Sequence, residues 1–200
     1  MIELYAITDH TTALLPDVAP LRLVAAGALA AVYAPAGDGA VSPEALWRHE
    51  AVVEALMGER DVLPVRYGTR FDDESAAADA IASRSADLAA ALDRVRGAVE
   101  LSLRALDPNA RQPDDGAGYL RAQRRRQQAR RSLHEPLAAI ARAATERPPR
   151  PPSELLRAAY LVDRSAVARV TERVERLQDA NPGLRLLCTG PWPAYSFVQA

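Results

Sequence analysis

The spacing of apolar residues switches along this chain between strand-like alternation and the three-to-four-residue repeat of amphipathic helices. Residues 2–7 and 21–34 are expected to form strands, and Gly27 permits a turn inside the second stretch. A capping hydroxyl at Ser42 and a proline at position 43 then begin a helical repeat that runs to about Gly58. Such switching predicts the α+β class of fold.

The first half of the chain is expected to close with a short strand and a helix. Residues 62–65 form the predicted strand, and Gly68 forms a turn. A single helix begins at Asp72 or Asp73 and ends near residue 95. We expect this half, residues 1–96, to be an N-terminal α+β domain.

The second half, residues 97–200, is expected to be a C-terminal domain with the order β-α-β-α-β. It begins where the apolar spacing changes again, around Gly97. A proline-rich stretch at 147–152 is expected to be a stiff linker, and Ser165 to cap the second helix. The order predicts a small sheet with helices on one face. The expected strands are 99–103, 155–162 and 184–188, and the expected helices are 119–144 and 165–180.

Charge and hydropathy argue against two classes of partner. The formal net charge is −1, so the overall charge of the chain does not favour binding to nucleic acid or to an anionic membrane. The longest apolar stretch, Leu23–Ala36, is shorter than the roughly 20 residues that cross a bilayer. A single cysteine, Cys188, fits a reducing compartment, and we expect a cytoplasmic protein.

The residues that could do chemistry form no recognisable set. His10, His49 and His134 are far apart in sequence, and none has a metal-ligand partner at usable spacing. We expect His49 to be a core histidine with one hydrogen bond, and His10 and His134 to lie at the surface. Cys188 is expected to be a buried structural thiol. We therefore predict no catalytic, cofactor-binding or metal-binding residues, and no enzyme.

Two features are candidates for contact with a protein partner. The segment 121–131 is rich in arginine and almost free of apolar residues, which predicts a solvated face or an arm for an acidic partner. The aromatic C-terminal tail either closes the core or offers a docking edge. The candidate contact residues are Arg121, Arg124, Arg125, Arg126, Arg130, Arg131, Trp192, Tyr195 and Phe197.

Other functions stay open on the residues alone. The segment Arg66–Arg70 lies between a strand and a helix, and is either a plain tight turn or an anion cradle. The alternative function is therefore a small-molecule or anion-binding regulatory domain. A nucleic-acid binder that uses the arginine arm is the next alternative, and the near-zero net charge argues against it.

Four segments, in this order and spacing, resemble the gas vesicle protein GvpL/GvpF family. They are 49–71, 119–120, 159–162 and 184–198, and the tail from Thr189 to Val198 is the most specific. The motif residues are Leu63, Pro64, Arg66, Gly68, Thr69, Tyr160, Thr189, Gly190, Pro191 and Trp192. The chain departs from the family in having Ala194 at a usual proline and little sequence between Ala144 and Leu155.

The resemblance implies a two-domain α+β fold whose C-terminal part is a modified ferredoxin-like domain. It implies a non-catalytic accessory protein of gas vesicle formation, associated with the vesicle in the cytoplasm. The expected partners are the small hydrophobic shell protein and other gas vesicle accessory proteins. The family has no agreed catalytic residues, and the resemblance does not separate GvpF from GvpL.

Overall fold

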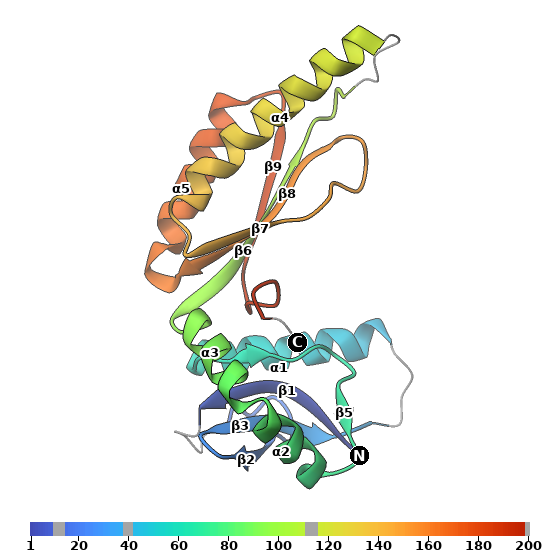
Figure 1. The fold of residues 1–200 in the computed structure, drawn as a ribbon, viewed down its shortest axis with the longest axis vertical. Coiled ribbons are helices and arrows are strands. Elements are labelled where there is room, and N and C mark those ends of the chain that lie inside the picture. Colours follow the sequence, from blue (N-terminus) through green and yellow to red (C-terminus); the bar gives the residue numbers. More distant parts are fainter. Residues whose placement is uncertain (10–14, 38–41, 111–115, 199–200) are drawn as a thin grey trace. The chain divides into compact units, whose positions relative to one another are not determined.

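The computed structural model describes residues 1–9, 15–37, 42–110 and 116–198 (Figure 1). By its internal contacts the chain divides into two compact units. Unit 1 comprises Met1–Gly97 and Pro193–Ala200, and unit 2 comprises Ala98–Trp192. Each unit combines helices with an antiparallel sheet, which confirms the α+β class. The expected independent domains, 1–96 and 97–200, stay predictions.

The sheet of unit 1 is built around its first strand. Its order is β2-β3-β1-β4, and β5 also pairs with β1. The central strand, β1, is almost wholly buried because it has a neighbour on each side. It includes residues 2–7, which confirms the expected opening strand. The bounds are β1 Ile2–Asp9, β2 Arg22–Ala26, β3 Leu29–Pro35, β4 Leu63–Pro64 and β5 Arg70–Phe71.

The first helix of unit 1, α1, spans Pro43–Glu59 and begins where the sequence predicts. Ser42 is its N-cap, and the Ser42 hydroxyl accepts a hydrogen bond from the Ala45 N–H at 3.1 Å. The helical spacing predicts a buried face of Leu46, His49, Val53 and Leu56. Leu46 is instead 40% exposed, and Val52 is buried.

The single helix expected over 72–95 is wrong, because the structure has two helices there. They are α2, Glu74–Ser83, and α3, Ser85–Val95, separated at Arg84, whose ψ of 17° is not helical. The hydroxyl of Ser83 donates to the Ala80 carbonyl at 2.8 Å. Serine side chains that bond the backbone in this way compete with the hydrogen bonds of a continuing helix.

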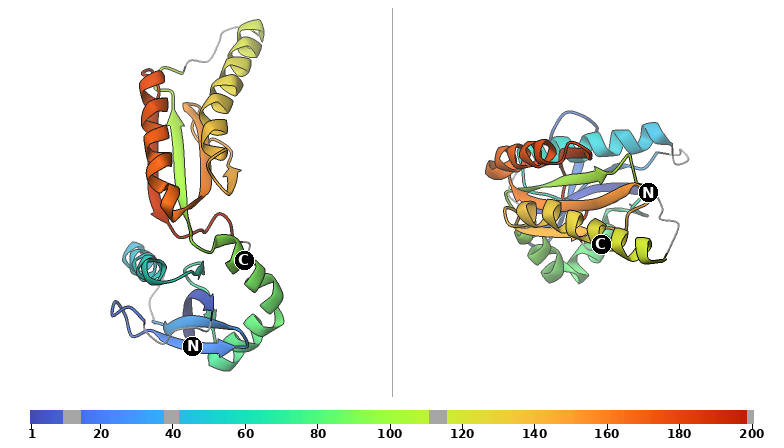
Figure 2. Two further views of the ribbon diagram at one scale, coloured as in Figure 1. Left: turned by 90° about the vertical axis from the view of Figure 1, so that its left-hand side faces the viewer. Right: turned by 90° about the horizontal axis from the view of Figure 1, so that it is seen from above.

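Unit 2 is a four-stranded antiparallel sheet with two helices packed against one face. The strand order is β7-β8-β6-β9. Helices α4 and α5 lie on the same face of this sheet (Figures 1 and 2). They share one apolar core with the inward side chains of β6 and β8. The bounds are β6 Ala98–Leu106, α4 Gly116–Ala138, β7 Ala143–Glu146, β8 Glu154–Asp163, α5 Val167–Ala180 and β9 Arg185–Trp192.

One strand of unit 2, β7, is absent from the expected order. The observed order is β-α-β-β-α-β. Residues 147–152 connect the two paired strands β7 and β8, so they form a hairpin loop and not the expected stiff linker. The Arg147 N–H, for example, donates to the Arg157 carbonyl at 2.8 Å. The ferredoxin-like assignment stays a prediction, and this element order supports it.

The helices of unit 2 differ from the expectations in two places: α4 ends at Ala138 rather than near residue 144, and α5 lacks the expected cap. Leu133 and Leu137 form the buried face of α4, as their helical spacing predicts. Ser165 does not cap α5, because Arg164–Ala166 forms a 3₁₀ turn before that helix. None of the helices in the described ranges is both long and apolar enough to cross a membrane.

Candidate functional site

A cavity of about 200 Å³ in unit 1 is lined by two of the segments that resemble a known family. The strand-and-turn segment contributes Leu63, Pro64, Arg66 and Thr69, and the C-terminal tail contributes Val198. The remaining lining side chains come from β1, β5, α2, α3 and the break between the two helices. Two motifs that lie far apart in the sequence therefore shape one hollow.

The segment Arg66–Arg70 is a tight turn that closes on itself. The backbone N–H and the hydroxyl of Thr69 both donate to the Arg66 carbonyl, at 3.2 and 2.8 Å. Gly68 has φ of +83°, which glycine adopts without strain. Its N–H is directed at the Glu3 carboxylate, 3.4 Å away. The tight-turn interpretation is therefore favoured over an anion cradle.

His49 is a core histidine with one hydrogen bond, as predicted. It is 1% exposed, and its Nε2 donates to the Val65 carbonyl at 2.8 Å, which fixes the start of the turn segment. The ring stacks on Tyr5 with centroids 4.7 Å apart. Its Nδ1 lies 3.6 Å from the Glu3 carboxylate, and Arg70 lies 3.5 Å from the same group. This buried cluster positions the turn beside the cavity.

The aromatic tail is distributed between the two units. Tyr195 and Phe197 are half-buried in unit 1, whereas Trp192 ends β9 in unit 2 and is 40% exposed. Burial and the negative charge of Glu50 raise the pKa of Tyr195, so its hydroxyl stays neutral. Ala194, at the usual family proline, is buried. Of the three candidate aromatics, Trp192 is the most accessible.

The arginine arm on α4 contains two kinds of side chain. Arg126 donates to the Glu154 carbonyl at 3.0 Å, and Arg130 donates to the Glu146 carboxylate at 2.5 Å, so these two anchor the helix. Two apolar side chains at the start of α4, Tyr119 and Leu120, are exposed. Four further arginines are exposed and have no ion pair within the described part of the chain: Arg121, Arg124, Arg125 and Arg131.

The expectation that His134 lies at the surface is wrong, because its side chain is only 20% exposed. Its Nδ1 lies 2.9 Å from the Tyr160 hydroxyl, and its Nε2 lies 3.8 Å from Glu146. Tyr160, a family-motif residue, is 1% exposed. Its pKa is raised mainly by burial and, to a smaller extent, by the negative charge of Glu146. His134 follows Leu133 on the helix face that packs against β8, and that adjacency is the sequence signal for its burial.

A buried carboxylate that the sequence did not single out holds one end of unit 2. Glu154 is 0% exposed and accepts hydrogen bonds from Arg104 Nε at 2.7 Å and Arg157 Nη2 at 3.0 Å. The Arg150 N–H donates to its other oxygen at 2.7 Å. Burial alone raises the pKa of Glu154, but these three donors outweigh it and lower the pKa to about 2.

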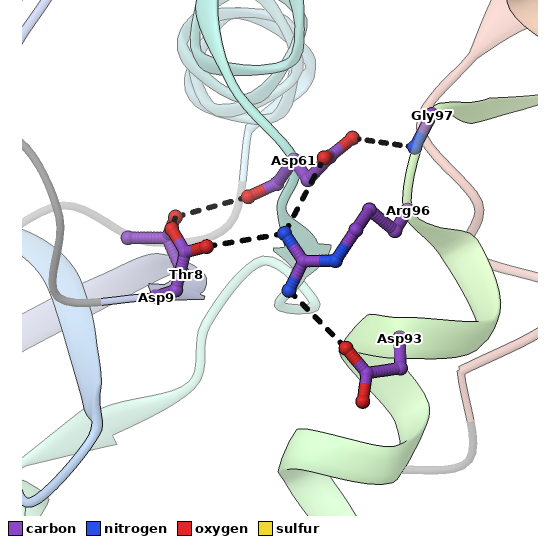
Figure 3. Close-up of polar contacts among 6 residues, drawn as sticks. All are labelled: Thr8, Asp9, Asp61, Asp93, Arg96 and Gly97. Atoms are coloured by element: carbon purple, nitrogen blue, oxygen red, sulfur yellow. Dashed lines mark hydrogen bonds and ion pairs between the residues drawn. The ribbon is translucent and has the colours of Figure 1, made fainter.

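A second polar cluster holds the end of unit 1 (Figure 3). Arg96 lies 3.1 Å from Asp9, 3.7 Å from Asp61 and 3.2 Å from Asp93. Asp61 also accepts a hydrogen bond from the Gly97 N–H at 2.7 Å. The side chain of Asp61 therefore joins the loop after α1 to Gly97, the last residue of the first segment of unit 1.

We expect Asp61→Ala to lower the free energy of unfolding by about 2 kcal/mol, because it leaves the half-buried Gly97 N–H without its acceptor. Urea denaturation measures this loss. Asp93→Ala is the matched control: the Asp93 side chain is 73% exposed, so its pair with Arg96 contributes about 0.5 kcal/mol or less. Equal losses in both variants would contradict this assignment.

The described residues do not assemble a recognisable catalytic set. Within 1–9, 15–37, 42–110 and 116–198, no three His, Cys, Asp or Glu side chains are grouped to hold a metal. Cys188 is half-buried, and burial raises its pKa, which keeps it as the thiol. Cys188 is therefore less buried than expected, and its structural role stays a prediction.

Comparison with known proteins gives consistent matches across the chain. The family model described as "Gas vesicle synthesis protein GvpL/GvpF" matches residues 3–115 and 119–199. Gas vesicle protein L of a Streptomyces species is 31% identical over 97% of this chain and 91% of that protein. Gas vesicle protein F2 of Halobacterium salinarum is 26% identical over 76% of this chain and 66% of its own length.

Two solved structures have the same fold. They are the crystal structures of GvpF from Anabaena sp. PCC7120 and from Microcystis aeruginosa, each with a TM-score of 0.83 over 100% of this chain. The match covers 96% and 99% of those chains, respectively. Sequence identity is 18% in both cases, so these similarities concern the fold alone.

Proposed function

This chain belongs to the gas vesicle synthesis protein GvpL/GvpF family, and from that premise we propose that it acts as a non-catalytic accessory protein that binds other proteins during assembly. A role in gas vesicle formation follows from the family itself. The proposed partners are the small hydrophobic shell protein and other accessory proteins. The proposed location is the cytoplasm, in association with the vesicle.

The four arginines of the arm that are exposed and unpaired in the described ranges are the observation that most supports partner binding. Arg121, Arg124, Arg125 and Arg131 project from α4 without ion pairs in the described ranges, and Tyr119 is exposed at the same helix. Unpaired guanidinium groups attract carboxylates of a partner and give the encounter its orientation. Accessible aromatic and aliphatic side chains beside them supply apolar contact.

The proposed mechanism is physical. A small hydrophobic shell protein exposes apolar surface and strand edges, which associate non-specifically when they are left uncovered. An accessory protein that covers such a surface holds the subunit soluble until it joins the growing shell. The arginine arm and Trp192 are the proposed contact residues of this chain, together with the accessible parts of Tyr195 and Phe197.

Co-expression with the shell protein from the same genome tests the proposal. We expect the shell protein to co-purify in soluble form only when this chain is present. The double variant Arg124→Gln and Arg125→Gln should reduce the recovered shell protein roughly fivefold, because two solvent-exposed charge contacts are lost. The charge-matched control is Arg169→Gln with Arg185→Gln, both exposed in unit 2 but outside the arm.

Two results would contradict the proposal. One is aggregation of the shell protein whether or not this chain is present, with no other gas vesicle protein recovered alongside it. The other is an equal loss of recovery in the arm variant and in the control variant. Saturable thermal stabilisation by phosphate without any protein partner would instead favour the anion-binding alternative.

A further inference from the structure

The unit 1 cavity has a mainly apolar lining. Leu4, Leu63, Ile81 and Leu88 line it, and all four are buried. The space of about 200 Å³ therefore presents mainly hydrocarbon to an occupant. An inorganic anion gains nothing from such a surface, whereas an aliphatic side chain of a partner does.

The same cavity also has two cationic side chains. Arg66, from the tight turn, and Arg84, from the break between α2 and α3, both line it and both are exposed. Neither side chain has a hydrogen bond or ion pair within the described residues. No aspartate or glutamate lines the cavity in that part of the chain. Charge complementarity therefore selects a carboxylate-bearing occupant.

The size of the space separates a peptide side chain from a larger small-molecule ligand. Pockets for drug-sized ligands begin at about 300 Å³, and this cavity is smaller. It accommodates one or two aliphatic side chains, whose main chain and acidic neighbours would stay outside, within reach of exposed guanidinium groups. Val198 of the tail completes the wall.

We propose that this cavity is a binding site for a short partner segment in which an aliphatic side chain stands next to one or more carboxylates. The aliphatic side chain enters the apolar space, and Arg66 and Arg84 bind the carboxylates. This inference rests on the proposed function, because it assumes that the chain binds a protein partner. It concerns a surface of unit 1, separate from the arginine arm of unit 2.

Fluorescence polarisation with a labelled synthetic peptide tests the site on the full chain. The probe is a short peptide of two leucines flanked by glutamates, and the comparison peptide has lysines in place of the glutamates. We expect saturable binding of the glutamate peptide only. Ala80→Leu places a larger side chain in the cavity and should weaken binding at least about tenfold.

Matched variants separate the site from general damage to the fold. Ala82→Leu is the control for Ala80→Leu, because Ala82 lies on the same helix, is exposed and does not line the cavity. The double variant Arg66→Glu and Arg84→Glu should reverse the preference between the two peptides. Arg94→Glu, on exposed α3 surface, should leave the preference unchanged. Thermal melts confirm that each variant is folded.

Several outcomes would overturn the inference. They are no saturable binding of the glutamate peptide, equal binding of the lysine peptide, or undiminished binding by folded Ala80→Leu. Binding of dodecanoate in place of the peptide would assign the site to small amphipathic acids instead. If these tests fail while the shell protein still co-purifies, only the cavity assignment falls. If co-purification fails and the peptide binds, the proposed function falls instead.

Discussion

Replacing Glu154 with glutamine is expected to lower the free energy of unfolding by about 3 kcal/mol, the low end of the cost of breaking a buried ion pair. The variant keeps the shape of the side chain but removes the charge that accepts from Arg104, Arg157 and the Arg150 N–H. Arg104 is partly exposed, so water compensates for part of the loss. Urea denaturation and hydrogen exchange of the β6 and β8 amides measure the effect.

The pH dependence gives an independent check. The folded pKa of Glu154, about 2, lies below its value of 4.5 in an unperturbed chain. The carboxylate therefore stabilises the fold fully above pH 4.5, and this stabilisation is lost as the pH falls from 4.5 towards 2. The glutamine variant should lack that component of acid sensitivity.

The control for Glu154→Gln is Glu172→Gln. Glu172 is exposed on α5 and pairs only loosely with Arg176, at 3.7 Å, so its replacement should change stability by less than about 0.5 kcal/mol. An acid transition that is identical in wild type and Glu154→Gln would show that the buried carboxylate does not contribute as described.

Gly190→Ala is the second substitution with a large expected effect, a loss of about 3 kcal/mol. Gly190 has φ of +120°, a conformation that side chains with a Cβ rarely adopt. An added Cβ would lie 2.7 Å from the Glu100 carbonyl oxygen and 3.0 Å from Leu101. The first of these is backbone in the paired strand β6, so it cannot move aside without disturbing the sheet.

Hydrogen exchange on β6 and β9 localises that effect, and thermal denaturation measures its size. Gly183→Ala is the matched control, because a Cβ there would meet no atom within 4 Å. We expect the control to stay within about 0.5 kcal/mol of wild type. A Gly190→Ala protein as stable as the control would refute the predicted backbone clash.

Much of the fold was predictable because its signals act within a few residues. The Ser42 cap, the turn at Gly27 with φ of +67° and the turn at Gly97 each mark a boundary that the structure places where expected. Asp73 likewise accepts from the Ala76 N–H at 2.9 Å and starts α2. These interactions depend on local geometry, which the residue type reveals directly.

The elements that sequence reasoning missed depend on tertiary pairing. Strand β7, Ala143–Glu146, shows no alternation of apolar and polar residues, and most of its residues are exposed. It forms because its backbone pairs with β8. The break at Arg84 falls inside a regular apolar repeat that continues on both sides. In both places the pattern of side chains does not distinguish the observed structure from the expected one.

The sequence identified some of the residues that line the candidate cavity, but not the cavity itself. Family resemblance singles out Leu63, Pro64, Arg66 and Thr69, but it does not state that they share a cavity with the tail. Val198 joins them only through the return of the chain to unit 1. Glu154 was missed for a related reason, because its donors come from two strands and a loop that meet only in the folded sheet.

The route of the chain has a consequence for its synthesis on the ribosome. The polypeptide leaves unit 1 at Gly97 and returns to it at Pro193, so all of unit 2 emerges before Val198 is available. Because synthesis proceeds at roughly 5–20 residues per second, Val198 emerges on the order of ten seconds after the first segment of unit 1. A translation product interrupted within unit 2 therefore lacks Val198 and has an incomplete cavity.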